Sequence, residues 1–171
     1  MLHWPRLVSL LSPDLVLENT IHKLTPEILD QYQLRGLILD VDDTLVSTQS
    51  TDVSPELTQW LLEIKQVAMV ALVSNNLSRS RIQRIATTLE LPFAFRAGKP
   101  SRRKLRQVVD TMELPLEQVA MVGDRLFTDI LAGNRLGLFT ILVDPVARAS
   151  PLSSLEFWIY NRLKASLTES S

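Results

Sequence analysis

The sequence predicts an α/β fold, a three-layer doubly wound parallel sheet of the Rossmann-like kind. Three observations lead to this prediction. Short apolar runs alternate with longer amphipathic segments, the runs are rich in Ile, Val and Leu, and the spacing between successive runs leaves room for a crossover helix. Five runs are expected as strands, at 37–41, 67–73, 93–95, 118–122 and 139–143.

The segments between these runs carry apolar residues at helical spacing, as in the stripe Leu57, Trp60, Leu61 and Ile64. Helix starts are indicated where a small polar residue precedes proline, and Gly137 is typical of a helix end. The expected helices are 27–33, a segment opening at 54–55, 78–89, 101–112 and 127–136.

The chain is expected to form one domain with no cap domain. We divide residues 1–171 into an N-terminal arm at 1–35, a catalytic core at 36–145 and a C-terminal helix at 151–171. Within the arm, 15–17 is interpreted as either an edge strand or an extended segment. The gaps 44–67 and 74–99 each have room for one helix and little more, which is too little for a cap domain.

Composition favours a folded, cytoplasmic protein. Hydrophobic residues make up 46% of the 171 and charged residues 22%, which is typical of a globular domain rather than a disordered chain. No apolar run approaches the roughly 18–20 residues of a membrane-spanning helix. A secretory signal pattern is missing, and the absence of cysteine excludes a disulfide framework.

Basic residues are unevenly distributed. Nine of the eighteen lysines and arginines lie between Ser74 and Arg106, where Glu90 is the only acid. This pattern indicates either an anionic partner or a solvated helix face.

Trp4 among leucines, and Phe157-Trp158 near the end, are candidates for peripheral membrane contact, with packing against the domain as the alternative.

An acidic cluster follows the first predicted strand. Asp40, Asp42 and Asp43 come within four residues and are followed by Thr44. Carboxylates this close repel one another, and a Mg²⁺ ion is the usual partner of such oxygen ligands. An EF-hand calcium loop starting at Asp40 would require Gly and Glu where this chain has Leu45 and Thr51.

Three other strand ends carry residues suited to phosphoryl transfer. Ser74 and Asn75 follow the second strand, Lys99 follows the third, and Asp124 and Asp129 follow the fourth. In a parallel sheet these ends meet at one edge, so a hydroxyl, an ammonium and further carboxylates are expected beside Asp40. Individually each has an ordinary alternative: a loop serine, an exposed lysine, and an N-cap by Asp124.

Together these segments resemble the four motifs of the haloacid dehalogenase superfamily. Asp-Val-Asp-Asp-Thr resembles the first motif, and the serine, lysine and Gly-Asp follow in the order of the other three. The sequences Val-Ser-Asn-Asn, Arg-Ala-Gly-Lys-Pro and Val-Gly-Asp-Arg-Leu-Phe-Thr-Asp are similar to those of the YqeG-type branch, in subfamily IIIA. Asp43 stands where this branch more often has Asn.

The resemblance implies a role for each matching residue. Asp40 would be the nucleophile that becomes an aspartyl-phosphate, and Asp42 the general acid and then the general base. The substrate phosphate would be held by Thr44, Ser74, Asn75 and Lys99. Mg²⁺ would be bound by Asp40, the backbone carbonyl of Asp42, and Asp124, supported from behind by Asp129.

The resemblance also implies a substrate, because relatives in this branch are phosphatidylglycerophosphatases. An uncapped site is compatible with a phosphate displayed on a large object such as a membrane, and the basic stretch with its anionic surface. A phosphatase for soluble sugar, nucleotide or protein phosphates is the first alternative. A non-catalytic receiver-like module is the second, although receivers place an acidic phosphate acceptor after the third strand, where this chain has Phe95-Arg96. Nucleic acid is not an expected partner, since no aromatics interleave the basic residues. The oligomeric state stays open.

Overall fold

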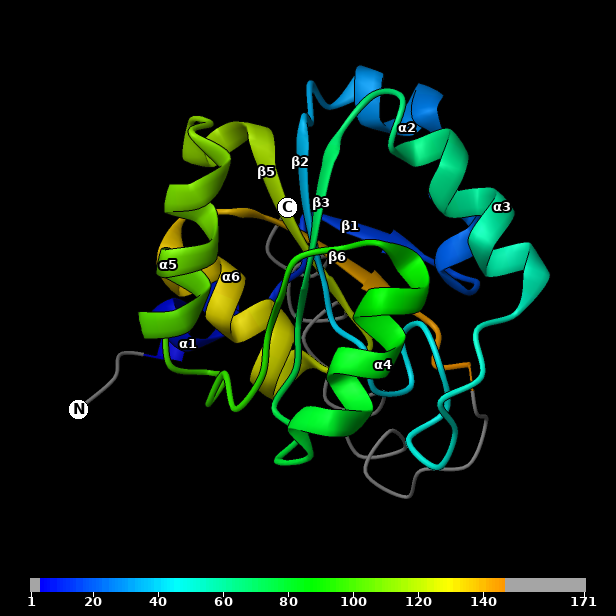
Figure 1. Cartoon of the computed structure of the whole chain (residues 1–171). Helices are drawn as coiled ribbons and strands as arrows, with labels where there is room; N and C mark the ends of the chain where they lie inside the picture. The colour runs from blue at the N-terminus through cyan, green and yellow to red at the C-terminus, as the bar shows by residue number, and fades with distance from the viewer. Residues whose placement is uncertain (1–3, 147–171) are drawn as a thin grey trace.

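The computed structural model of the chain describes residues 4–146, and it confirms the predicted parallel sheet (Figure 1). All pairings are parallel, and the strand order is β1-β6-β5-β2-β3-β4. The strands are β1 (Leu15–Leu17), β2 (Gly36–Leu39), β3 (Met69–Val73), β4 (Phe93–Ala94), β5 (Val119–Gly123) and β6 (Phe139–Val143).

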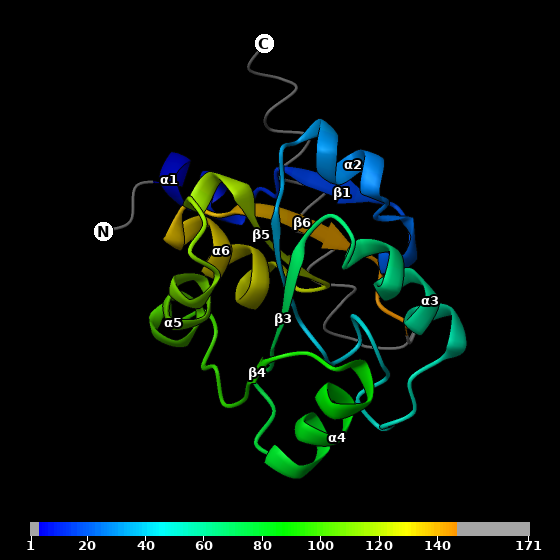
Figure 2. The same ribbon diagram turned by 45° about the horizontal axis from the view of Figure 1, so that its top comes forward.

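Helices cover both faces of the sheet, as Figures 1 and 2 show. One face carries α2 (Pro26–Gln31), α3 (Pro55–Ile64) and α4 (Arg79–Leu89), and the other carries α5 (Arg103–Met112) and α6 (Leu131–Leu136), with α1 (Trp4–Leu11) packed on α6. Strand β2 is buried on both sides. Leu37 and Leu39 belong to the hydrophobic cluster under α3 and α4, whereas Ile38 belongs to the cluster under α5. This alternation follows from the two-residue period of a strand.

Local signals set the helix ends. The Ser54 hydroxyl accepts a hydrogen bond from the backbone N–H of Leu57 at 3.1 Å, with Pro55 at the first helical position. Gly137 ends α6 with φ at +84°, a left-handed value that favours glycine. The helix expected at 101–112 begins two residues later, at Arg103, because Ser101 lies in the turn that follows Lys99.

The segment 15–17 is an edge strand, which decides between the two readings of the N-terminal region. One residue, Asp14, fixes its position on β6. Its carboxylate oxygen Oδ2 accepts from the backbone N–H of Thr140 at 2.7 Å and from the Thr140 hydroxyl at 2.9 Å, while the Asp14 N–H donates to the Thr140 carbonyl at 3.0 Å. Ile21 and Leu24, further along, are fully buried. The sheet therefore includes residues from the predicted arm.

The chain reverses its direction of winding at β2, which lies between β3 and β5. Open α/β sheets bind ligands outside the carboxyl ends of the strands at such a switch point. Only α3 separates β2 from β3, and only α4 separates β3 from β4, so neither gap contains a cap domain. Among residues 4–146, no helix has both the length and the apolar character needed to cross a membrane. The helix expected at 151–171 and the Trp4 side chain lie outside the described part.

Candidate active site

Asp40 lies directly after β2 with its carboxylate buried. Its backbone N–H donates to the carbonyl of Val122 at 2.9 Å, and this bond ties the residue that follows β2 to the neighbouring strand β5. One carboxylate oxygen, Oδ1, accepts from the Lys99 ammonium at 2.5 Å. The Thr44 hydroxyl lies 3.5 Å from the other oxygen. The first motif is therefore anchored to groups that come from distant parts of the chain.

Lys99 lies at the centre of the site. Its side chain is 1% exposed, and its ammonium donates to both Asp40 and Asp129, at 2.5 and 2.6 Å. Asn75 fixes the backbone at this position: the Lys99 N–H donates to the Asn75 side-chain carbonyl at 2.8 Å, and the Asn75 amide donates to the Lys99 carbonyl at 3.0 Å. The Asn75 side chain therefore positions Lys99, which is a different contact from the phosphate contact predicted for it.

Asp129 reaches Lys99 through an unusual turn after β5. The helix expected at 127–136 begins as a π-helical turn, Leu126–Ile130, before it continues as α6. Asp129 Oδ2 accepts from the Arg125 backbone N–H at 3.2 Å. The carboxylate packs so closely on Gly123 that a Cβ there would lie 2.3 Å from Oδ2, so the position requires glycine. π-turns are found preferentially at functional sites.

Asp124 completes an acidic group with Asp40 and Asp129. One carboxylate oxygen from each lies within 4.8 Å of the others. Asp124 Oδ1 accepts from the Thr44 hydroxyl at 3.1 Å, and Asp124 does not cap the following turn. Thr44 is fully buried and its hydroxyl is directed to the carboxylates.

The charges of this group do not balance. Three carboxylates face one buried ammonium, and the partly exposed Arg125 guanidinium lies 4.0 Å from Asp124, so negative charge stays in excess when all are ionised. Burial, together with the neighbouring charge of Asp129, raises the pKa of Asp40 to about 8 and that of Asp124 to about 7. Burial alone would lower the pKa of Lys99, but the charges of Asp129 and Asp40 outweigh it and raise that pKa above its ordinary value.

The donor set fits a hard divalent cation. Carboxylate oxygens that converge without a nitrogen or sulfur ligand are the donors that Mg²⁺ prefers, and the excess negative charge of the group favours a cation. Asp129 was predicted to support the metal ligands from behind. In the structure it contacts Lys99 directly and also belongs to the acidic group.

Asp42 lies on a separate side of the site. Its Oδ2 accepts from the Ser74 hydroxyl at 2.8 Å, and its Oδ1 accepts from Arg81 at 2.6 Å and from the Asn76 amide at 3.4 Å. The structure therefore places the Ser74 hydroxyl against Asp42. The carboxylate that would handle protons is kept apart from the acidic group around Lys99.

Arg81 was missed by sequence reasoning, which counted it only among the basic residues. Besides Asp42, its guanidinium donates to the carbonyls of Ser47 and Ser50, at 3.0 and 3.1 Å, and thus fastens the loop after β2 to α4. One signal was available. A cation in the first turn of a helix is opposed by the helix dipole, so an arginine there suggests a partner elsewhere.

Asp43 has a backbone role. Its φ is +63°, in the left-handed region that Asn and Asp tolerate better than other side chains. Its carboxylate accepts from the Thr48 N–H at 3.1 Å, and its N–H donates to the Val46 carbonyl. Asp or Asn therefore meets the same conformational requirement here.

Comparison with known proteins gives matches over most of the chain. A family model described as mitochondrial PGP phosphatase matches residues 5–90, and one described as HAD-hydrolase-like matches residues 96–150. Probable phosphatase YqeG of Bacillus subtilis is 40% identical over 136 residues, which are 79% of this chain and 78% of that protein.

Two further relatives carry phosphatidylglycerophosphate in their names. Phosphatidylglycerophosphatase GEP4 of Saccharomyces cerevisiae is 29% identical, over 91% of this chain and 90% of its own. Phosphatidylglycerophosphate phosphatase 1 of Arabidopsis thaliana is 30% identical over 72% of this chain and 38% of its own. Among solved structures, NagD of Escherichia coli K-12 shares the fold, with a TM-score of 0.54 at 17% identity, covering 71% of this chain and 91% of its own.

The charge imbalance predicts that two substitutions in this group affect stability differently. Lys99→Met should lower the free energy of unfolding of the metal-free protein by about 3–5 kcal/mol, because it leaves buried carboxylates without their cation. Asp40→Asn should leave that free energy unchanged or raise it, because Lys99 keeps Asp129. Urea denaturation of both variants measures the difference, with the exposed Lys23→Met as the matched control. A large loss on Asp40→Asn would instead make Asp40 a structural residue.

The raised pKa values predict a pH dependence in metal-free buffer. Between the ordinary value of 3.8 and their folded values of about 8 and 7, Asp40 and Asp124 hold protons in the folded protein that the unfolded chain has released. Raising the pH through this window should therefore lower the free energy of unfolding. Denaturation at pH 5 and about pH 8.5 measures the slope, and Asp40→Asn should make it shallower. Equal slopes in the two proteins would contradict the assignment.

Proposed function

Because this chain belongs to the haloacid dehalogenase-like phosphatases of the YqeG group, we propose that it is a Mg²⁺-dependent phosphomonoester hydrolase that acts through an aspartyl-phosphate. We further propose phosphatidylglycerophosphate as its substrate, with phosphatidylglycerol and phosphate as the products. The observation that carries the reaction type is the buried arrangement of Asp40 and Lys99 within an acidic group of three carboxylates.

In the first step a carboxylate oxygen of Asp40 attacks phosphorus, and the bond from phosphorus to the ester oxygen breaks. The Lys99 ammonium, 2.5 Å from Asp40, orients the nucleophile and offsets the negative charge of the arriving phosphate. Asp42 donates a proton to the leaving oxygen, which departs as an alcohol. The product is an acyl phosphate on Asp40.

In the second step water hydrolyses the acyl phosphate. Asp42, now ionised, accepts a proton from water, and the water oxygen attacks phosphorus to release phosphate and regenerate Asp40. Ser74, Asn76 and Arg81 keep Asp42 in one place through both steps. The nucleophile and the proton-transfer group are therefore held by different residues, Asp40 by Lys99 and Asp42 by this second set.

The cation would be held by Asp40 and Asp124 with the backbone carbonyl of Asp42, and Asp129 would lie behind it against Lys99. When bound, Mg²⁺ supplies positive charge to the transferring phosphoryl group and removes the repulsion among the carboxylates. The Thr44 hydroxyl, which donates to Asp124, would keep that carboxylate oriented.

The lipid substrate is supported by three observations. The family model that matches residues 5–90 is described as a PGP phosphatase, and two relatives are named for that activity. The site has no cap domain in the gaps after β2 and β3, so a headgroup at a membrane surface can reach it. Basic residues are concentrated between Ser74 and Arg106, and those of α5, Arg103, Lys104 and Arg106, favour a peripheral place on an anionic membrane from the cytoplasmic side.

A soluble phosphate ester is the second candidate. A stretch of 70 residues is 43% identical to ribonucleotide monophosphatase NagD of Escherichia coli, of which it covers 28%. That match covers only 39% of this chain and 28% of NagD, so it supports a shared chemistry more than a shared substrate.

Phosphate release from phosphatidylglycerophosphate in mixed micelles with Mg²⁺ tests the proposal. The rate should exceed that on a panel of soluble sugar and nucleotide phosphates, and both Asp40→Asn and removal of Mg²⁺ by chelation should abolish it. Turnover of soluble esters alone would keep the mechanism and reject the lipid substrate. No turnover on any substrate would contradict the proposal that these residues form a phosphatase active site.

Arg81→Gln is expected to lower kcat by roughly tenfold to a hundredfold, because a small displacement of a proton-transfer group is that costly. Arg81→Lys should restore little, since one ammonium cannot bond Asp42 and the carbonyls of Ser47 and Ser50 together. Steady-state kinetics on each variant measures the effect, and Arg84→Gln, an exposed change on the same helix, is the control. A change in KM alone would mean that Arg81 binds substrate instead.

A further inference from the structure

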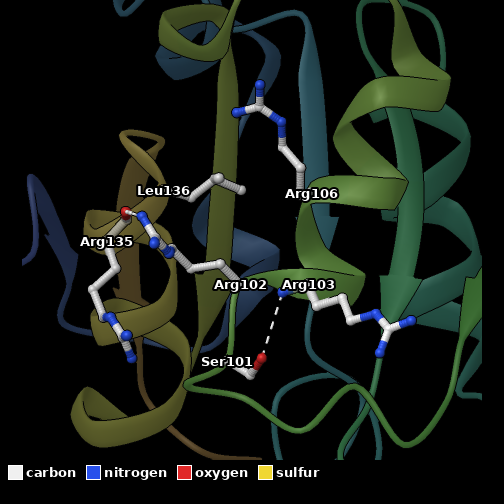
Figure 3. A pocket seen from close by; sticks show the side chains of 6 residues that line it. All are labelled: Ser101, Arg102, Arg103, Arg106, Arg135 and Leu136. Carbon is white, nitrogen blue, oxygen red and sulfur yellow. Dashed lines mark hydrogen bonds between the residues drawn. The ribbon is translucent and has the colours of Figure 1, made fainter.

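A pocket with four arginines lies between α5 and α6, as Figure 3 shows. Its volume is 670 Å³, within the range of small-molecule sites. The lining residues come from the turn before α5, from its first half and from the end of α6, and none is acidic: Ser101, Arg102, Arg103, Arg106, Arg135 and Leu136. A concave surface with four positive charges and no lining acid is a strongly anion-attracting feature.

Two of the arginines, Arg102 and Arg135, are held in place by hydrogen bonds to backbone carbonyls. Arg102 donates to the Arg135 carbonyl at 2.9 Å, and Arg135 donates to the Pro100 carbonyl at 3.1 Å. These bonds join α5 to α6 and use only part of each guanidinium, so other N–H groups stay available at fixed positions. Preorganised donors lose less entropy when a ligand binds.

The other two arginines are exposed on α5. Arg106 pairs through Nε with Asp110 at 3.2 Å, in an exposed i,i+4 contact. Such pairs are worth little, so Asp110 does not cancel the attraction of the pocket for an anion. Within residues 4–146, Arg103 has no side-chain hydrogen bond or ion pair of its own.

The pocket is close to the active site along the chain. Ser101 follows Lys99 by two residues, so their Cα atoms are at most ~7 Å apart. Lys99, however, points into the buried acidic group. The two positively charged regions are therefore neighbours with different surroundings: one is buried among carboxylates, and the other is open with no carboxylate among its lining residues.

We propose that the α5–α6 pocket binds a phosphate ester group, distinct from the phosphate that reacts at Asp40. Guanidinium groups bind phosphate oxygens with paired N–H donors, which is why arginine rather than lysine predominates in such sites. The ligand can come from two sources, the phosphodiester of a phospholipid headgroup or a soluble phosphate ester. The proposal goes beyond the proposed function because it holds whichever monoester is hydrolysed.

The test compares two double variants with the same change in charge. Arg103→Gln with Arg106→Gln removes the exposed pair from the pocket and keeps the bonds that join α5 to α6. Arg79→Gln with Arg84→Gln removes two exposed arginines from α4, which packs on the opposite face of the sheet. Thermal unfolding checks that both variants fold as the unmodified chain does.

Binding is measured in metal-free buffer with two probes, so that catalysis does not contribute. The first probe is glycerophosphoglycerol, a soluble phosphodiester with no monoester for Asp40 to attack. Its binding is measured by titration calorimetry. The second probe is a pair of vesicle preparations, phosphatidylcholine alone and phosphatidylcholine with phosphatidylglycerol. The fraction of protein that sediments with each kind of vesicle is measured.

The pocket variant should bind the anionic probe about thirtyfold more weakly, because each arginine near an anionic surface contributes roughly fivefold. The α4 variant should bind nearly as the unmodified chain does. A loss with glycerophosphoglycerol that leaves vesicle binding unchanged indicates a soluble ligand. A loss of binding to anionic vesicles, with or without a loss for the soluble diester, indicates the headgroup of a lipid. Equal losses in both variants, or no binding by the unmodified chain, would overturn the proposal.

Discussion

The structure depends most on one buried ammonium shared by carboxylates that outnumber it. Lys99 contacts Asp40 and Asp129 directly, and Asp124 lies beside them, so three acids occupy a space that most proteins fill with apolar groups. Several features serve this arrangement. Gly123 admits the Asp129 carboxylate, the π-turn directs it inward, and Asn75 fixes the backbone of Lys99. In the proposed function, a divalent cation would offset the remaining negative charge and would then attract the phosphoryl group.

The side of the site that contains Asp42, the proposed proton-transfer group, is built differently. Asp42 is two residues from Asp40, yet it bonds to Ser74 and Arg81 and takes no part in the acidic group. Two carboxylates from one strand end thus meet two electrostatic environments, one crowded with acids and one containing an arginine. Differences of this kind allow neighbouring carboxyl groups to take different chemical roles. Arg81 also bonds the loop at Ser47 and Ser50, so the same side chain links the loop that borders the site to α4.

The sequence was sufficient to predict the sheet and the edge at which the site lies. Strand runs, helix stripes and the four motifs are local patterns, and parallel strands bring their ends together wherever the loops go. Contacts between loops could not be predicted in the same way. Arg81 meets Asp42 and the two serine carbonyls across 31 to 39 residues, and no spacing encodes that meeting. The bonds of Asn75 to Lys99 and of Thr44 to Asp124 depend likewise on how turns fold. Hydrogen bonds between residues from different strand ends decide which of the predicted residues are free to contact a ligand and which position another residue of the site.

The bonds between Asp14 and Thr140 have a consequence for where the folding unit begins. Strand β1 covers the outer side of β6 and satisfies hydrogen-bonding groups that would otherwise face solvent. A shortened chain beginning at Gly36 would retain every residue of the four motifs, yet it would present β6 as a bare strand to other molecules. Exposed edges of this kind invite intermolecular pairing and aggregation. The first thirty-five residues, which resemble an appendage in the sequence, thus include the segment that protects this side of the catalytic sheet from self-association.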